Sequence, residues 1–225
     1  MKLNADLTLR AHLNISNLKW ENSPSSGVQR LRLEADDDSP PVERVTTIVQ
    51  FAPNSSFSGH VHPGGEEFLV LDGTFSDQHA DYPKGYYVRN PKGTGHAPHS
   101  HDGCTIIVKL WQMHPDDDQQ LAINTHDQSL WNSNKETGDV LTLFNASYET
   151  VEMLRWYKGM QFNNLTFESG VEYFLIYGCF SDDQDTYTDG SWLRLPAGSI
   201  QNIKVIENCL IFRKTNHLLE PVVYE

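Results

Sequence analysis

The chain has 225 residues, of which 38% are hydrophobic and 11% aromatic, and its formal net charge at pH 7 is −13. This length is enough for one large or two small hydrophobic cores. The negative charge argues against direct, non-specific binding to nucleic acid, because a phosphate backbone requires a basic protein face.

The first ten residues read M-K-L-N-A-D-L-T-L-R. They lack the continuous apolar core of a signal peptide, and no stretch of the chain reaches the roughly 18 apolar residues of a membrane-spanning helix. We therefore expect a cytoplasmic protein that does not enter a membrane. The three cysteines, Cys104, Cys179 and Cys209, have neither metal-finger nor redox spacing. They are predicted to be buried and reduced.

Short runs of alternating apolar and polar residues, bounded by Gly, Pro, Asn and Asp, follow one another along the chain. They include V-Q-R-L-R-L, T-T-I-V-Q-F and T-I-I-V-K-L in the first half, and V-L-T-L-F, Y-F-L-I and W-L-R-L in the second. This alternation predicts antiparallel strands. An antiparallel sheet closed into a barrel or jelly roll has a mouth that can hold a ligand. The sequence therefore predicts an all-β fold.

The strongest functional signal lies in the segment G-H-V-H-P-G-G-E-E-F-L-V-L-D-G at residues 59–73. His60 and His62 are two residues apart, so on a strand both imidazoles point to the same side. The Pro-Gly-Gly turn that follows can bring a carboxylate, from Glu66 or Glu67, toward those rings. This arrangement predicts most of a metal site.

A second segment marked by Gly and Pro, residues 85–96, ends an apolar strand on His96. We expect this histidine to supply the fourth ligand. His99 and His101 follow in the run A-P-H-S-H. They are either exposed loop histidines or residues that support the ligands or contact a substrate.

The spacing of the two motifs resembles that of the cupin superfamily. It reads H-x-H, three residues, E, six residues and G, and then G, five residues, P-x-G, two residues and H. The surrounding residues, H-V-H-P-G-G-E-E-F-L-V-L-D-G-T-F-S-D and Y-V-R-N-P-K-G-T-G-H-A-P-H-S, are similar to the ChrR-like cupin family. That family includes the metal-binding domain of some anti-sigma factors and also free-standing proteins. The resemblance implies a small β-barrel with one divalent metal bound by the positions that here are His60, His62, Glu66 and His96.

The chain also contains an internal repeat. A shift of 105 residues (178 − 73) aligns Gly73 with Gly178, Arg89 with Arg194, and Cys104 with Cys209. Upstream, Trp20 and Gly27 match Trp131 and Gly138 at a shift of 111 (131 − 20). We therefore predict a bicupin, that is, two tandem cupin domains, each a double-stranded β-helix or jelly-roll barrel. Residues 1–115 form the metal-binding domain and residues 116–225 a degenerate domain without metal ligands.

The second copy lacks all four predicted ligands. In place of His60, His62, Glu66 and His96 it has Leu165, Phe167, Val171 and Gln201. Joint loss is expected if the four residues served one metal. Glu67, in contrast, matches Glu172, which favours Glu66 as the ligand and a structural role for Glu67. Arg89 is interpreted as structural for the same reason, because it recurs as Arg194.

The identity of the metal separates two functional hypotheses. Zinc held by all four ligands would form a closed site, suited to a regulatory or sensing protein that responds to a small molecule or an oxidant. Iron, manganese or nickel would keep open positions and suit the alternative, a metal-dependent dioxygenase acting on a diketone, a flavonol or a thiol. A small-molecule ligand is expected in both cases.

The sequence is compatible with a protein partner and with a homo-oligomer. In anti-sigma factors of the family, a helical segment with a histidine and a C-x-x-C pair precedes the cupin domain. This chain has neither the C-x-x-C pair nor the helical pattern. Binding to a sigma factor by that route is therefore not expected.

Overall fold

The computed structural model describes residues 2–39 and 42–219. Nearly all regular structure in this part of the chain is β-strand, and the two helical segments are short 3₁₀ turns, η1 (Ile15–Asn17) and η2 (Gln128–Leu130). The predicted all-β class is therefore confirmed. Within the described residues, no helix has the length and apolar character needed to cross a membrane.

The chain forms two compact units whose sequences interleave. Among the described residues, the first unit contains residues 2–5 and Lys19–His126, whereas the second contains Asp6–Leu18 and residues 127–219. The division predicted from the repeat, 1–115 and 116–225, is continuous in sequence. The compact units thus have different boundaries from the sequence repeats.

The main sheet of the first unit has the strand order β1-β4-β5-β13-β8-β10-β14. Its strands are β1 (Lys2–Leu3), β4 (Val28–Ser39), β5 (Val42–Phe51), β8 (Glu66–Ser76), β10 (Tyr86–Asn90), β13 (Cys104–Leu110) and β14 (Leu121–Asn124). Short strands complete the unit: β3 (Glu21–Asn22), β6 (Ser55–Ser56), β7 (His60–Val61), β9 (Asp81–Pro83), β11 (Gly95–His96) and β12 (His99–Ser100). All pairings are antiparallel.

The sheet of the second unit has the order β15-β16-β21-β18-β20-β2, with β17 beside β21 and β19 beside β18. Its strands are β2 (Ala11–Asn14), β15 (Asp139–Asn145), β16 (Thr150–Trp156), β17 (Gln161–Phe167), β18 (Val171–Ser181), β19 (Thr186–Thr188), β20 (Ser191–Leu195) and β21 (Ser199–Thr215). Apart from β1, which has no counterpart among the described strands, the two orders correspond strand for strand. The duplication predicted from the sequence is therefore present in the fold.

One glycine recurs in both units because the backbone geometry requires it. Gly73 and Gly178 have positive φ angles of 69° and 106°. A Cβ atom would lie 2.1 Å from the carbonyl oxygen of Gly103 in the first unit and 2.2 Å from that of Asn208 in the second. Only glycine fits where the strand bends this close to its neighbour.

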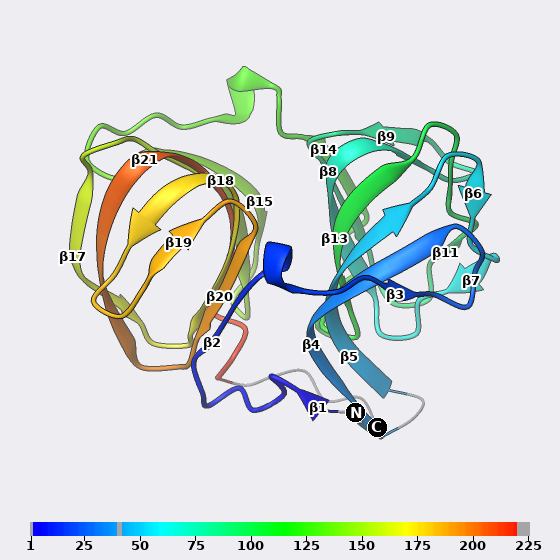
Figure 1. The fold of residues 1–225 in the computed structure, drawn as a ribbon, viewed down its shortest axis with the longest axis horizontal. Helices are drawn as coiled ribbons and strands as arrows, with labels where there is room; N and C mark the ends of the chain where they lie inside the picture. Colours follow the sequence, from blue (N-terminus) through cyan, green and yellow to red (C-terminus); the bar gives the residue numbers. More distant parts are fainter. Residues whose placement is uncertain (1, 40–41, 220–225) are drawn as a thin grey trace. The chain divides into compact units, whose positions relative to one another are not determined.

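In each of the two strand orders, the last strand comes from the other sequence repeat. β14 pairs with β10 in the first unit, although it follows residue 115, and β2 from the N-terminal segment pairs with β20 in the second unit. Figure 1 shows the blue strand β2 running beside β20. We call β2 and β14 the exchanged strands.

The two repeated arginines hold the segments that lead into the exchanged strands. Arg89 donates from Nε to Asp117 Oδ2 at 2.8 Å, and both side chains are buried. Arg194 donates to the carbonyl oxygen of Asp6 at 2.8 Å. The structural role predicted for these arginines is thus the attachment of the exchanged strands.

The cysteines differ in burial. All three are free thiols, Cys104 and Cys209 are buried, and Cys179 is only half-buried, contrary to the prediction that all three are buried. Burial raises the pKa of the Cys104 thiol to about 11 and that of Cys209 to about 12. Neither buried thiol carries charge at neutral pH.

Candidate metal centre

A tight turn brings the first two histidines and the glutamate to one place. His60 begins β7, His62 follows it, and Glu66 begins β8. Between them, the N–H of Gly65 donates to the carbonyl oxygen of His62 at 3.3 Å. Gly65 has a φ of 74°, and a Cβ atom there would lie 2.4 Å from the sulfur of Met113. The turn predicted from the Pro-Gly-Gly sequence is present, and it requires this glycine.

The fourth residue comes from the neighbouring short strand. β11 pairs with β7 so that His96 lies opposite His60. The ring centroids are 5.1 Å apart for His60 and His62, 5.1 Å for His60 and His96, and 4.6 Å for His62 and His96. One potential ligand atom from each of the three histidines and Glu66 lies within 4.8 Å of all the others. The structure therefore brings the four predicted ligands together.

Hydrogen bonds set the tautomers of His60 and His62. Nδ1 of His60 lies 2.9 Å from the carbonyl oxygen of Ser58, which can only accept. Nδ1 of His62 lies 3.1 Å from Oγ1 of Thr94, and that hydroxyl donates its own proton to the carbonyl oxygen of Pro91. Both Nδ1 atoms must therefore carry the proton and donate. The Nε2 lone pairs are left for the centre of the cluster.

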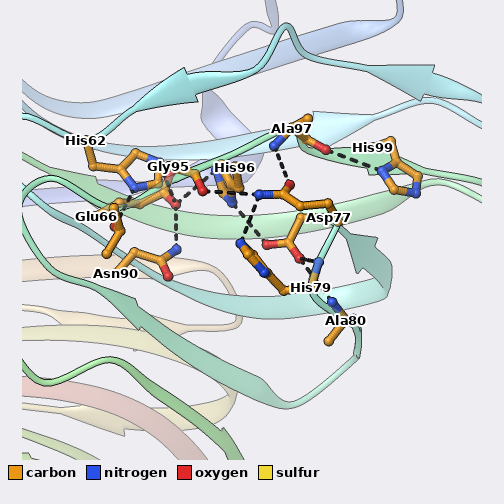
Figure 2. A network of polar contacts seen from close by, with 12 residues as sticks. His62, Glu66, Asp77, His79, Ala80, Asn90, Gly95, His96, Ala97 and His99 are labelled. Atoms are coloured by element: carbon orange, nitrogen blue, oxygen red, sulfur yellow. Dashed lines mark hydrogen bonds and ion pairs between the residues drawn. The ribbon is translucent and has the colours of Figure 1, made fainter.

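His96 is held in the same way by a carboxylate. Its Nδ1 lies 3.3 Å from Asp77 Oδ2. A dashed line joins the two side chains in Figure 2. The other oxygen of Asp77 accepts from the backbone N–H groups of His79 and Ala80 at 2.8 and 3.1 Å. A carboxylate behind a histidine fixes the ring and makes its free nitrogen a stronger donor to a metal.

The free ring nitrogens fit a metal rather than a hydrogen-bond network. Among the described residues, Nε2 of His62 and Nε2 of His96 are buried without a hydrogen-bond partner. Burial, reinforced by the neighbouring histidines, lowers the pKa of His62 to about 3 and that of His96 to about 4. Both rings are neutral at physiological pH, which is the form that binds a metal.

Glu66 completes the cluster. Its Oε2 atom lies 3.5 Å from His62 Nε2 and 3.4 Å from His96 Nε2, and it accepts a hydrogen bond from Asn90 Nδ2 at 3.2 Å. Burial raises the pKa of this carboxyl to about 7, although the Asn90 hydrogen bond lowers it. A cation among these atoms would favour the ionised form. Three neutral imidazoles and one carboxylate are a donor set for a divalent transition metal.

Glu67 faces the opposite side of the strand. Its Oε2 accepts hydrogen bonds from the Tyr87 hydroxyl at 2.7 Å and from Arg89 Nη1 at 3.1 Å. Alternation along β8 thus separates the two adjacent carboxylates. Glu66 is the one that lies among the histidines.

The four residues lie in the wall of a cavity of about 510 Å³ in the first unit. Most of the remaining wall is apolar, and aromatic side chains from Phe57, Phe75 and Trp111 contribute to it. A small molecule inside this cavity would therefore contact the cluster directly.

His99 and His101 lie outside this arrangement. Both are exposed, and neither lines the cavity. Nδ1 of His99 is 3.4 Å from the carbonyl oxygen of Ala97, and Nδ1 of His101 is 2.7 Å from Asp102. The structure does not bring these two histidines to the four candidate ligands.

The equivalent place in the second unit is filled by its core. Leu165 lies opposite Gln201, as His60 lies opposite His96. Leu165 and Phe167 pack against the core cluster that contains Val171. Gln201 donates from its side-chain amide to Asp182 Oδ2 at 2.9 Å. Asp182, the equivalent of Asp77, thus holds the residue that replaces His96.

Sequence comparison identifies both halves of the chain. The model of the ChrR cupin-like domain matches residues 8–114 and again residues 118–219. No curated protein matches the chain significantly.

Several solved structures share the fold at low sequence identity. A candidate dioxygenase from Nostoc punctiforme is 12% identical with a TM-score of 0.77, and the alignment covers 97% of this chain and 87% of that one. The pirin YhhW from Escherichia coli, in complex with nickel(II), is 12% identical with a TM-score of 0.68 over 95% and 100% of the two chains. Oxalate decarboxylase from Bacillus subtilis, which has Mn(II) centres, is 11% identical with a TM-score of 0.64 over 92% and 77%.

Proposed function

Because this chain belongs to the ChrR cupin-like family, as its motifs predicted and its two domain matches confirm, we propose that it is a sensing or regulatory protein that responds to a small molecule or an oxidant. It holds one divalent transition metal through His60, His62, Glu66 and His96. The observation that carries the proposal is the convergence of unpartnered imidazole nitrogens and one carboxylate on the wall of a cavity large enough for a small molecule.

The residues around the cluster have distinct tasks in this proposal. The three histidines and Glu66 hold the metal, while Ser58, Thr94 and Asp77 keep each imidazole in the tautomer that leaves Nε2 free. The apolar wall limits water around the bound molecule. When bound, the metal would supply a Lewis acid and, if it is redox-active, a path for electron transfer.

The metal itself is proposed to be zinc or one of iron, manganese and nickel. Zinc with four protein ligands would favour sensing, because a closed site offers the small molecule no open position unless a ligand is displaced. Metals that prefer more ligands would let the molecule bind directly.

Oxidative turnover is the second candidate function. It is supported by the likeness of this fold to the candidate dioxygenase from Nostoc punctiforme and by the apolar cavity beside the cluster. Under this alternative, the chain is a metal-dependent dioxygenase for a diketone, flavonol or thiol. Sensing and turnover differ in whether the bound molecule is consumed.

Elemental analysis of protein purified untagged without oxygen tests the proposal. We expect one metal ion per chain. Zinc would favour sensing, whereas iron, manganese or nickel would justify following oxygen uptake with diketones, flavonols and small thiols. A protein that takes up no metal, even when supplied with each of these ions, would contradict the proposal.

Two variants assign the site within the chain. His62→Ala should abolish stoichiometric binding, because it removes one of the three converging imidazoles. Gln201→His, the matched change in the second unit, should leave the content at one ion per chain, because Leu165 and Val171 still fill the surroundings. Full metal content in His62→Ala would refute the assignment.

We also propose that the protein acts in the cytoplasm, where its three free cysteines would stay reduced. Any protein partner would be recognised by a route other than the zinc-binding helical segment of anti-sigma factors.

A further inference from the structure

Two arginines share the cavity with the candidate metal ligands. On β4, alternate residues face the same side, so Val28, Arg30 and Arg32 point one way. Val28 belongs to the core cluster of the first unit, and all three residues line the cavity. The strand therefore directs two guanidinium groups toward the inside of the barrel.

The strand register places these arginines across the sheet from Glu66. Arg32 pairs with Thr47, and Thr47 pairs with Val108. Two residues further along β13, on the same face as Val108, Leu110 pairs with Glu66. The arginines and Glu66 thus stand on different strands that line the same cavity.

The side chain of Arg30 is half-buried and lacks an acidic partner among the described residues. Its Nε atom is buried without a hydrogen-bond acceptor, and its side chain has no carboxylate partner in the described part of the chain. Arg32 lies 3.6 Å from Glu21, whose side chain is 56% exposed. A half-buried cation without an acidic partner gains stability from a ligand that supplies negative charge.

The second unit shows what happens to these positions where the metal ligands are missing. Arg30 faces Val49 across the β4–β5 pair, and the equivalent of Val49 at a shift of 105 is Leu154. Leu154 is faced by Val140, so valine stands where the first unit has Arg30. By the same register, Thr142 stands in the place of Arg32. Both arginines are absent together with all four candidate ligands.

The second unit also shows how this fold satisfies an interior arginine without a ligand. Arg213 donates from Nε to Glu152 at 3.1 Å, with a second, shorter contact of 2.5 Å from Nη2. The equivalent positions in the first unit are Val108 and Thr47, so no carboxylate is supplied there. In the unit without candidate metal ligands, the arginine is thus paired with a carboxylate of the protein itself.

We infer that the molecule bound in the cavity is a carboxylate with an apolar body. Its carboxylate pairs with Arg30 and Arg32, and a pair of oxygen atoms at its other end reaches the metal site. This inference rests on the proposed metal site. A divalent metal, ionised Glu66 and the two guanidinium groups sum to a formal charge of +3 (2 − 1 + 2), and Glu21 beside Arg32 lowers it to +2. An anionic ligand reduces this charge further. The planar fork of arginine matches a carboxylate in two parallel hydrogen bonds.

The test uses the full-length protein loaded with cobalt(II), whose visible spectrum reports ligand binding. The probes are 3,4-dihydroxybenzoate, which has a chelating oxygen pair and an opposed carboxylate, and its neutral isostere 3,4-dihydroxybenzamide. We expect the wild type to bind the benzoate at least about tenfold more tightly than the benzamide, the range of a charged hydrogen bond.

Arg30→Gln should weaken binding of the benzoate by about tenfold or more and leave binding of the benzamide unchanged. Arg155→Gln, in the second unit, is the matched control and should change neither. Arg30→Lys should bind the benzoate with an affinity between those of the wild type and Arg30→Gln, because lysine keeps the charge but lacks the planar fork. Arg30→Lys replaces Arg30→Gln if the glutamine variant fails to fold. Equal affinity for the benzoate in the wild type and Arg30→Gln would overturn the inference.

Cobalt content separates this failure from failure of the proposed function. Full cobalt loading with no effect at Arg30 overturns only the carboxylate site. If no cobalt binds, the proposed metal site is wrong, and calorimetric titration of the metal-free protein with the benzoate still tests Arg30. A heat of binding that Arg30→Gln removes would support the carboxylate site, and an unchanged heat would refute it.

Discussion

The three histidines of the cavity differ in the group that holds the second ring nitrogen. His60 donates to a backbone carbonyl, His62 to a hydroxyl and His96 to the carboxylate of Asp77. A carboxylate partner raises the basicity of an imidazole more than a neutral acceptor does. His96 should therefore be the strongest of the three donors.

Asp77→Asn tests this role. The asparagine can still accept from the backbone at His79 and Ala80, but the charge behind His96 is lost. We expect the affinity for a divalent metal to fall by about 10- to 100-fold, measured by competition with a chelator. Asp182→Asn is the matched control, because Asp182 accepts from two backbone N–H groups in the same way. Its metal affinity should equal that of the wild type, and an equal loss in both variants would mean that the effect comes from the turn alone.

The pKa of Glu66 makes the stability of the metal-free protein depend on pH. The unfolded chain releases this proton near the ordinary value of 4.5, whereas the folded chain keeps it up to about 7. The folded state thus binds more protons between these values, and the contribution of Glu66 to stability falls as the pH rises through this range. The lowered pKa values of His62 and His96 act in the opposite direction.

Comparison with Glu66→Gln isolates the carboxyl, because the amide does not titrate. In metal-free protein, the wild type should lose stability relative to Glu66→Gln between about pH 5 and about pH 8, by at most about 3 kcal/mol. Thermal unfolding at several pH values measures the difference. With saturating metal the trend should reverse, because the metal binds the ionised form. A difference that stays constant with pH in the metal-free protein would show that Glu66 titrates normally.

The sequence predicted the four converging residues from the spacing of the two motifs, and their joint loss from the second repeat supported the assignment. The same comparison could have found Asn90, the partner of Glu66, because its equivalent is Leu195. It could not find Asp77, because Asp182 is kept to hold Gln201. A residue that serves the fold in both copies can serve the ligands in one, and conservation within the chain hides that second task.

At the scale of strands, periodicity predicted antiparallel structure and the duplication, but not the exchanged strands. Alternation marks a segment as a strand and says nothing about its partner. Ala11–Asn14 and Leu121–Asn124 are four residues each, and proximity in the sequence assigned each to its own repeat. Their pairing with β20 and β10 depends on tertiary contacts such as that between Arg89 and Asp117.

Asp117 should matter far more to stability than its equivalent, Asp6. Asp117→Ala leaves the buried guanidinium of Arg89 with one carboxylate fewer, and breaking a buried pair costs about 3–5 kcal/mol. Asp6 is exposed, and its backbone carbonyl, which the alanine keeps, accepts the hydrogen bond from Arg194, so Asp6→Ala should change stability by less than about 1 kcal/mol. Denaturant unfolding measures both. Similar losses in the two variants would contradict this account of how the exchanged strands are held.

For the whole molecule, the interleaved units predict which fragments fold. A fragment of residues 1–115 lacks β14 and Asp117, whereas a fragment of residues 19–126 contains both together with the metal site. We expect the fragment 19–126 to unfold cooperatively and to bind metal, and the fragment 1–115 to be unstable. Circular dichroism during heating and metal content compare the two. A fragment 1–115 that is as stable as 19–126 would show that the exchanged strand is dispensable.

The exchanged strand β2 also sets the order in which the chain can fold as it is synthesised. Asn14 on β2 and Ser191 on β20 are 177 residues apart. At a synthesis rate of about 5–20 residues per second, β2 leaves the ribosome about 9 to 35 s before its partner exists. The first unit can close once residue 126 has emerged. At that time Asp6–Leu18, which belong to the second unit, have already been synthesised. A ribosome that stalls before residue 191 therefore leaves β2 without its partner, and the nascent chain keeps an unpaired strand.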